Sequence, residues 1–139
     1  MRVKRPKDLY YSENHLWLKL EEKNEAMLGV TDYLIRNMET INYIKLPKVK
    51  GEIEQDAFFC EIDTDDGLTT LISPVSGKIL EVNGDLTKNY NLLLEDNYDE
   101  GWLLRIKLTD PTEVESLISY EEYNEFIESE LAEADEDED

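Results

Sequence analysis

The chain has only one cysteine and one histidine among its 139 residues. The single cysteine, Cys60, excludes an internal disulfide, as is typical of proteins from a reducing compartment. The single histidine, His15, excludes a metal centre or proton relay built from several histidines. No apolar run approaches the length of a membrane span. The opening MRVKRPKDLYY is basic but lacks the apolar stretch of a secretory signal, so we expect a surface segment rather than the alternative, a transit peptide, and a cytoplasmic location.

Basic residues are also scarce, with 14 lysines and arginines against 34 acidic residues and a formal net charge of −20. Such a chain repels phosphate backbones and anionic lipid, which argues against nucleic acid and membrane partners and favours basic protein surfaces. Residues 128–139 (ESELAEADEDED) contain no basic residue. Self-repulsion and few large apolar groups predict that this tail is disordered beyond about one helical turn. One folded domain is therefore expected over residues 1–127.

Long helical patterns are absent before the last 30 residues, and the chain up to that point is predicted to be mainly β-strand. Alternation in HLWLKL places Leu16, Leu18 and Leu20 on one side of a strand. A short internal helix is expected after Thr31, which can cap it. Two C-terminal helical segments begin at Asp110 and Ser119, each with a glutamate three residues later. Strands are predicted over residues 15–20, 25–30, 41–46, 56–62, 68–73, 78–82 and 102–108.

The segment CEIDTDDGLTTLISPVSGKI, residues 60–79, is predicted to be a hairpin that presents its turn to solvent. Asp66-Gly67 favours the primed two-residue turns that match the twist of paired strands. Hairpins of this shape can carry a modifiable side chain at the turn. However, residues 51–77 contain no lysine.

Six motifs follow one another in the order YSENHLW (11–17), GVTDY (29–33), LPKVKGEI (46–53), SPVSGKILEVN (73–83), EGWLLRIK (100–107) and SYEEYNEF (119–126). Together they closely resemble the H protein of the glycine cleavage system over roughly residues 8–127. SPVSG alone would indicate only the wider group of lipoyl and biotinyl carriers. The resemblance implies a lipoyl-type barrel-sandwich hybrid of β-strands with peripheral helices, in agreement with the strand pattern.

The resemblance also implies a lipoyl attachment site. The family's hairpin reads approximately E-S-V-K-A, and its lysine carries the lipoyl arm that visits the decarboxylase, the aminomethyltransferase and the dihydrolipoyl dehydrogenase. Counting back from SPVSG without a gap aligns this motif with Asp63, Thr64, Asp65, Asp66 and Gly67, so that Asp66 stands at the lysine position. A carboxylate cannot form the lipoyl amide, which requires an amine nucleophile. We therefore predict that the chain carries no lipoyl group.

The hairpin and the nearby lysines allow other assignments. Lys50 and Lys78 could be relocated attachment sites, although both are predicted to lie away from the turn. DTDDG is spaced too tightly for a calcium loop, and Pro74 stands where such a loop needs a bidentate glutamate. A phosphoaspartyl transferase would need a larger α/β domain. A solvated acidic turn is the favoured interpretation.

No catalytic, cofactor-binding or metal-ligating residue is expected elsewhere. His15 and the tryptophans Trp17 and Trp102 fall within the family motifs and are expected to be structural. Cys60 is expected to be a packed thiol, because no histidine is near it in sequence to activate it. The chain also lacks a glycine-rich phosphate loop.

We predict a non-lipoylated H-protein-like module that is not an enzyme. Its expected work is protein binding, as a docking or regulatory module for enzymes that handle lipoyl carriers. One alternative is a glycine cleavage carrier that is lipoylated at an unusual site. Another is an H-like fold redeployed in a different pathway, such as sulfur metabolism.

Overall fold

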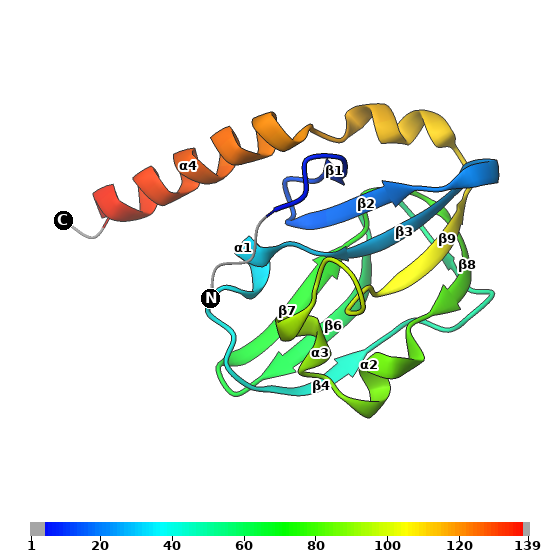
Figure 1. Cartoon of the computed structure of the whole chain (residues 1–139), viewed down its shortest axis with the longest axis horizontal. Helices are drawn as coiled ribbons and strands as arrows, with labels where there is room; N and C mark the ends of the chain where they lie inside the picture. The colour runs from blue at the N-terminus through cyan, green and yellow to red at the C-terminus, as the bar shows by residue number, and fades with distance from the viewer. Residues whose placement is uncertain (1–4, 138–139) are drawn as a thin grey trace.

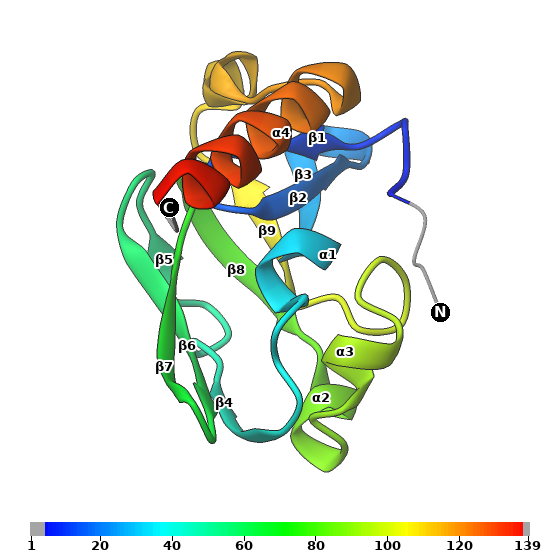
Figure 2. The same cartoon turned by 90° about the vertical axis from the view of Figure 1, so that its left-hand side faces the viewer.

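The computed structural model describes the backbone of residues 5–137 and the side chains of residues 5–131. Within this range the strands form two antiparallel sheets, one with the order β1-β2-β3-β9-β8-β5 and one with the order β4-β6-β7. The prediction of a mainly β barrel-sandwich is confirmed, and Figure 2 shows the smaller sheet beside the larger one. The strands are β1 Tyr10–Tyr11, β2 Leu16–Leu20, β3 Glu25–Val30, β4 Ile41–Lys45, β5 Glu52–Ile53, β6 Phe58–Thr64, β7 Gly67–Ile72, β8 Gly77–Val82 and β9 Leu104–Leu108.

Helices cover the two ends of this sandwich. Helix α4 crosses over β1 and β2 at one end, and the short helices α2 and α3 pack together at the other (Figures 1 and 2). The expected internal helix is α1, and the Thr31 hydroxyl caps it by accepting a hydrogen bond from the Leu34 N–H. The bounds are α1 Asp32–Ile35, α2 Gly84–Lys88, α3 Leu92–Glu95 and α4 Tyr120–Asp137, with 3₁₀ turns η1 Glu22–Asn24 and η2 Pro111–Ser116.

The main core lies between the sheets. Leu16 and Leu18 of β2 meet Ile62 of β6 and Leu71 of β7 there, and all four are at most 1% exposed. Leu20, predicted on the same side of the strand as Leu16 and Leu18, is 43% exposed at the end of β2. The alternating pattern of a strand buries a side chain only where an opposite layer covers it.

A second, aromatic cluster fills the space between β2 and helix α4. Trp17 points out of the main core into this cluster, where the rings of Tyr11 and Tyr123 stack with centroids 4.8 Å apart. Gly29, opposite Trp17 on β3, leaves room for the indole, since a Cβ at this position would lie 2.3 Å from it. Strand β2 is therefore covered on both faces, which a single alternating pattern does not reveal.

The C-terminal segment differs from its predicted disorder. Helix α4 continues through residue 137, and residues 138–139 lie outside the described part of the chain. Glutamate, alanine and leucine are strong helix formers, and no glycine or proline interrupts residues 120–137, so the helix has no local reason to end earlier. The capping box at its start forms as expected, with Ser119 and Glu122 exchanging side chain to backbone hydrogen bonds.

The second predicted capping box does not form. Asp110 caps η2 by accepting a hydrogen bond from the Thr112 N–H, but Glu113 does not reach back to Asp110. Its carboxylate accepts hydrogen bonds from the N–H and the hydroxyl of Ser76, at 2.7 and 3.0 Å. Glu113 thereby holds the SPVSG corner that follows the hairpin.

Candidate functional site

The β6–β7 hairpin is the candidate site, and its turn lies one residue earlier than predicted. Thr64 pairs with Gly67, so Asp65 and Asp66 form the two-residue turn. Neither aspartate has a positive φ, and Gly67 instead adopts φ +133°. A primed turn needs positive φ in its central residues, so the predicted primed Asp66-Gly67 turn is wrong. The hairpin itself, with its turn exposed to solvent, is confirmed.

Thr64 fixes the shape of the turn from within. Its side chain is 9% exposed, and its hydroxyl accepts a hydrogen bond from the Asp66 N–H at 3.2 Å. The same hydroxyl donates to the Gly67 carbonyl at 3.1 Å. A threonine that bonds the backbone two residues on is a standard turn-stabilising device. The conformation therefore does not depend on the side chain at position 66.

The two turn aspartates have different surroundings. Asp65 accepts a hydrogen bond from the Asn42 amide on β4, at 2.9 Å. Asp66 makes no side-chain hydrogen bond or ion pair to any residue among 5–131, and it borders a shallow groove of about 250 Å³. Asp66 is thus the turn residue whose side chain is available to a partner.

The groove beside Asp66 joins the hairpin to the segment that begins in helix α1. Its walls are partly apolar, because Leu34, Met38 and Leu68 are among the residues that line it. Leu34 and Met38 are also packed against the main core, so these walls are fixed in place. The lining residues are Leu34, Asn37, Met38, Thr64, Asp66, Gly67, Leu68 and Thr69.

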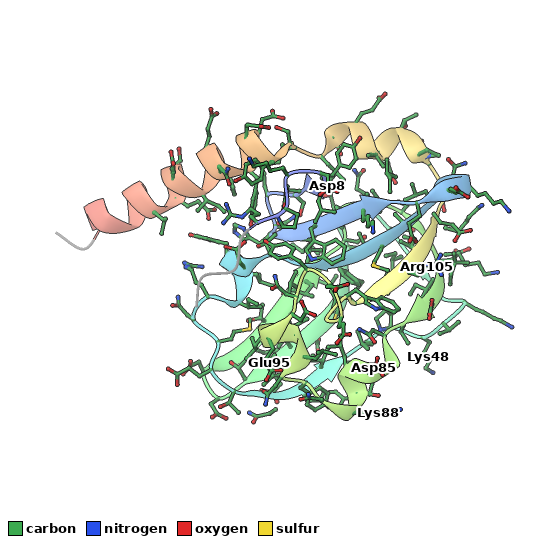
Figure 3. All side chains as sticks on the ribbon, viewed as in Figure 1. Asp8, Lys48, Asp85, Lys88, Glu95 and Arg105 are labelled. Atoms are coloured by element: carbon green, nitrogen blue, oxygen red, sulfur yellow. The ribbon has the colours of Figure 1, made fainter. Side chains whose placement is uncertain are left out.

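The chemistry of this turn does not fit a lipoyl group. An amide with lipoate needs a primary amine, and the exposed side chains at positions 63, 65 and 66 are carboxylates. Lys78 lies on β8 paired with Glu52, and the Lys50 N–H bonds to the Ile79 carbonyl, so both belong to the larger sheet and its margin. Figure 3 shows Lys48 and Lys88 at the right and bottom of the molecule, away from the β6–β7 turn at its left.

Cys60 and His15 are both held in structural positions. Cys60 is 3% exposed, and burial raises the pKa of its thiol to about 12, which removes the thiolate that a nucleophile requires. The His15 ring accepts or donates a hydrogen bond with the Tyr123 hydroxyl at 2.8 Å, and its Nε2 lies 3.4 Å from Glu130 of α4. Burial lowers the pKa of His15 and the Glu130 carboxylate raises it, with a net lowering. His15 therefore joins the loop before β2 to helix α4 rather than lining the hairpin groove.

The two tryptophans, Trp17 and Trp102, also have structural roles. The indole N–H of Trp17 donates to the Asn97 carbonyl at 3.0 Å. Trp102 packs against the aromatic cluster, and its carbonyl accepts a hydrogen bond from Asn83 at 2.8 Å. Among the described residues, no group of three or more His, Cys, Asp or Glu side chains could hold a metal ion. No helix among these described residues is long and apolar enough to span a membrane.

The two facing sheets, the hairpin turn and the helix over β2 define a lipoyl-type barrel-sandwich. The sequence model of the glycine cleavage H-protein matches residues 9–130. The chain belongs to this family. Its relatives include the glycine cleavage system H proteins of Alkaliphilus oremlandii (41% identical, covering 88% of this chain and 94% of the relative) and Halothermothrix orenii (37% identical, covering 88% and 95%).

Similarity to a solved structure agrees with this assignment. The crystal structure of a glycine cleavage system H protein from Mycobacterium marinum superposes with a TM-score of 0.77 at 24% sequence identity. The match covers 86% of this chain and 95% of that one. At this identity the comparison supports the fold, and the family rests on the sequence matches.

Sequence reasoning missed the residues that shape the site around Asp66. Asn42 holds Asp65 from the neighbouring strand, and no local pattern reports a contact across 23 positions. The groove wall contributed by Asn37 and Met38 depends on how the chain after α1 returns to the hairpin. Thr64 did carry a signal, because Thr-Asp-Asp-Gly is a turn sequence in which the threonine can bond the backbone.

Proposed function

We propose that this chain is an H-protein-like module that carries no lipoyl group and works by binding proteins. Its partners would be the enzymes that handle lipoyl carriers, which it would dock to or regulate without catalysing a reaction itself. The observation that carries the proposal is the exposed β6–β7 hairpin turn, which presents Asp66 where the resemblance implies a lysine. A cytoplasmic location is part of the proposal and is supported by the single, buried cysteine.

The geometry of the turn supports binding over covalent chemistry. Asp66 is exposed on a turn that Thr64 fixes, beside a groove with partly apolar walls. An enzyme that receives the hairpin of an authentic H protein would meet the corresponding β6–β7 hairpin here. It would find a negative charge in place of the lipoyl arm, so this chain would occupy the docking site without delivering a group for transfer.

The test is a competition for docking. The purified chain is titrated by calorimetry into each of the three glycine cleavage enzymes and a lipoate ligase, alone and then in the presence of an authentic H protein. We expect the chain to bind at least one of them and to be displaced by the authentic protein. Binding to none of the four would overturn the proposal, as would binding that the authentic protein does not displace.

A matched pair of variants locates the contact. Asp63→Asn/Asp66→Asn removes two charges from the hairpin. Glu95→Gln/Asp99→Asn removes two charges from α3 and the loop after it, which Figure 2 shows on the other side of the molecule from β6 and β7. The hairpin variant should weaken binding more than the control variant does. Equal effects would show that only the overall negative charge matters and that the hairpin is not the docking element.

A further inference from the structure

The two sheets of the described chain have four edge strands, and three of them are protected against further pairing. Strands β1 and β5 have only two residues each, and β1 is also bridged to Ile118. Strand β4 has a register irregularity between Ile41 and Tyr43, ends on Lys45, and is followed by Pro47. Short length, bulges, lysine and proline are the devices by which proteins keep sheet edges from adding another strand.

Strand β7 is the fourth edge. Its ladder with β6 has a register irregularity, but the extra residue lies on β6, between Phe58 and Cys60, and β7 itself has no bulge, lysine or proline. It runs for six residues, Gly67–Ile72, with the sequence GLTTLI. This strand contains no charge and no proline, and threonine, leucine and isoleucine suit a pleated strand. It pairs only with β6. Among the described residues, the one further hydrogen bond to its backbone runs from the Thr64 hydroxyl to the Gly67 carbonyl at the turn. In an antiparallel edge strand every second residue turns its N–H and C=O away from its neighbour, so β7 offers an unused ladder.

The surroundings of this edge fit an extended segment. The groove of about 250 Å³ is lined by residues from the first half of β7 and by Leu34 and Met38. Leu68 is 60% exposed on β7 and would pack beside an added strand. Figure 1 shows α1 above the β7 end of the smaller sheet, with the chain after α1 descending past the hairpin turn. Asp66 closes the groove at the turn and makes that end negative.

We propose that the free edge of β7 binds an extended segment of a partner protein by strand addition. The segment pairs its backbone with β7, places an apolar side chain between Leu68 and Met38, and carries a lysine or arginine beside Asp66. The inference rests on the proposed function, because it specifies how a docking partner engages the same hairpin. A second copy of this chain is a poorer occupant, since two chains that each have a net charge of −20 would have to associate.

The test is a peptide titration followed by NMR of the ¹⁵N-labelled full chain. The probe is a capped peptide of alternating valine and threonine that ends in two lysines. One control peptide carries N-methyl groups on alternate backbone amides, which blocks strand pairing and keeps the side chains. A second control peptide ends in two glutamates. We expect the first probe to shift and protect the β7 amides, and each control to bind about tenfold more weakly or worse, because either the strand hydrogen bonds or the ion pair with Asp66 cannot form.

Two protein variants make the test specific to this edge. Thr70→Lys adds an edge-protecting lysine to β7, and Tyr43→Lys makes the same addition on the already protected β4 edge; both positions are exposed. Binding should fall several-fold in the first variant and stay unchanged in the second. Equal binding of the N-methylated peptide, no binding, or shifts confined to β4 would each overturn the proposal. Concentration-dependent dimerisation through β7 would also overturn it and make a second copy the occupant.

The peptide result can be separated from the proposed function. Strand addition to β7 uses no lipoyl group, so it is measured equally well if the chain proves to be lipoylated elsewhere. If the peptide does not bind but the chain docks to an enzyme, the strand-addition proposal is wrong and the proposed function stands. Peptide binding without docking to any lipoyl-handling enzyme would leave the edge site in place and remove the proposed partners.

Discussion

Replacing Asp66 with lysine should turn the hairpin into an acceptor for lipoate. The position is exposed, its φ is negative, and the turn is held by Thr64 and Gly67 rather than by the Asp66 side chain. A lysine there adopts the existing backbone without strain and points its amine toward solvent. It also replaces one of three neighbouring negative charges with a positive one, which relieves repulsion from Asp63 and Asp65.

The magnitude of the stability change follows from these surroundings. The Asp66 carboxylate makes no side-chain hydrogen bond to residues 5–131, and its replacement uncovers no apolar area. The free energy of unfolding should therefore change by no more than about 0.5 kcal/mol. Chemical denaturation of Asp66→Lys and of the parent protein should give midpoints that nearly coincide.

The assay incubates the folded variant with lipoate ligase, ATP and lipoate, and an authentic H protein is charged in a parallel reaction. We expect Asp66→Lys to gain one lipoyl mass, more slowly than the authentic protein because Asp65 keeps a charge where the family has valine. Asp65→Lys is the matched control and should stay unmodified, because position 65 faces Asn42 on β4 rather than the groove. If folded Asp66→Lys remains unmodified while the authentic protein is charged, the alignment of this hairpin with the family's lipoyl motif is wrong.

Three further predictions concern the scaffold. Gly29→Ala should lower the free energy of unfolding by about 1–3 kcal/mol, measured in urea, because its Cβ would lie 2.3 Å from Trp17; an unchanged midpoint would contradict the tight packing of β2 on β3. Deleting residues 128–139 should cost no more than about 1 kcal/mol, since among the described side chains it removes the contact of the Glu130 carboxylate with the His15 ring. A much larger destabilisation by calorimetry would show that the segment is part of the folded core. Burial lowers the folded pKa of His15 below its unfolded value. The contribution of His15 to stability is therefore present above about pH 6.5 and declines as the pH falls through that value. The free energy of unfolding of His15→Asn should decline less steeply than that of the parent between about pH 7 and 5.5, and an unchanged slope would assign the effect to other groups.

The strands and the family could be predicted from the sequence because their signals are local. Alternation identified β2, and the motif SPVSG fixed the end of the hairpin. The burial of Trp17 could not be predicted, since it depends on helix α4 returning from more than a hundred positions away to cover the outer face of β2. Leu20 follows the same alternation as Leu18 but lies beyond the covered region.

The candidate site shows the same division between local and distant signals. The absence of a lysine and the place of Asp66 could be read from the chain, and Thr64 lay in a recognisable turn sequence. The position of the turn could not be predicted from the sequence. It follows from the pairing of Thr64 with Gly67, and both Asp65-Asp66 and Asp66-Gly67 are dipeptides that can turn a chain. The groove and the open edge of β7 depend on the strand order β4-β6-β7, which hydrophobic patterns do not report.

The proposed function depends above all on this member of the glycine cleavage H-protein family carrying no lipoyl group. Intact-mass spectrometry of the protein purified from a lipoylating host is the decisive test, with an authentic H protein from the same host as the positive control. We expect the unmodified mass of the chain alongside a fully or partly lipoylated control. A lipoyl adduct on this chain, mapped by peptide sequencing to Lys50, Lys78 or any other lysine, would contradict the proposal and make the chain a carrier.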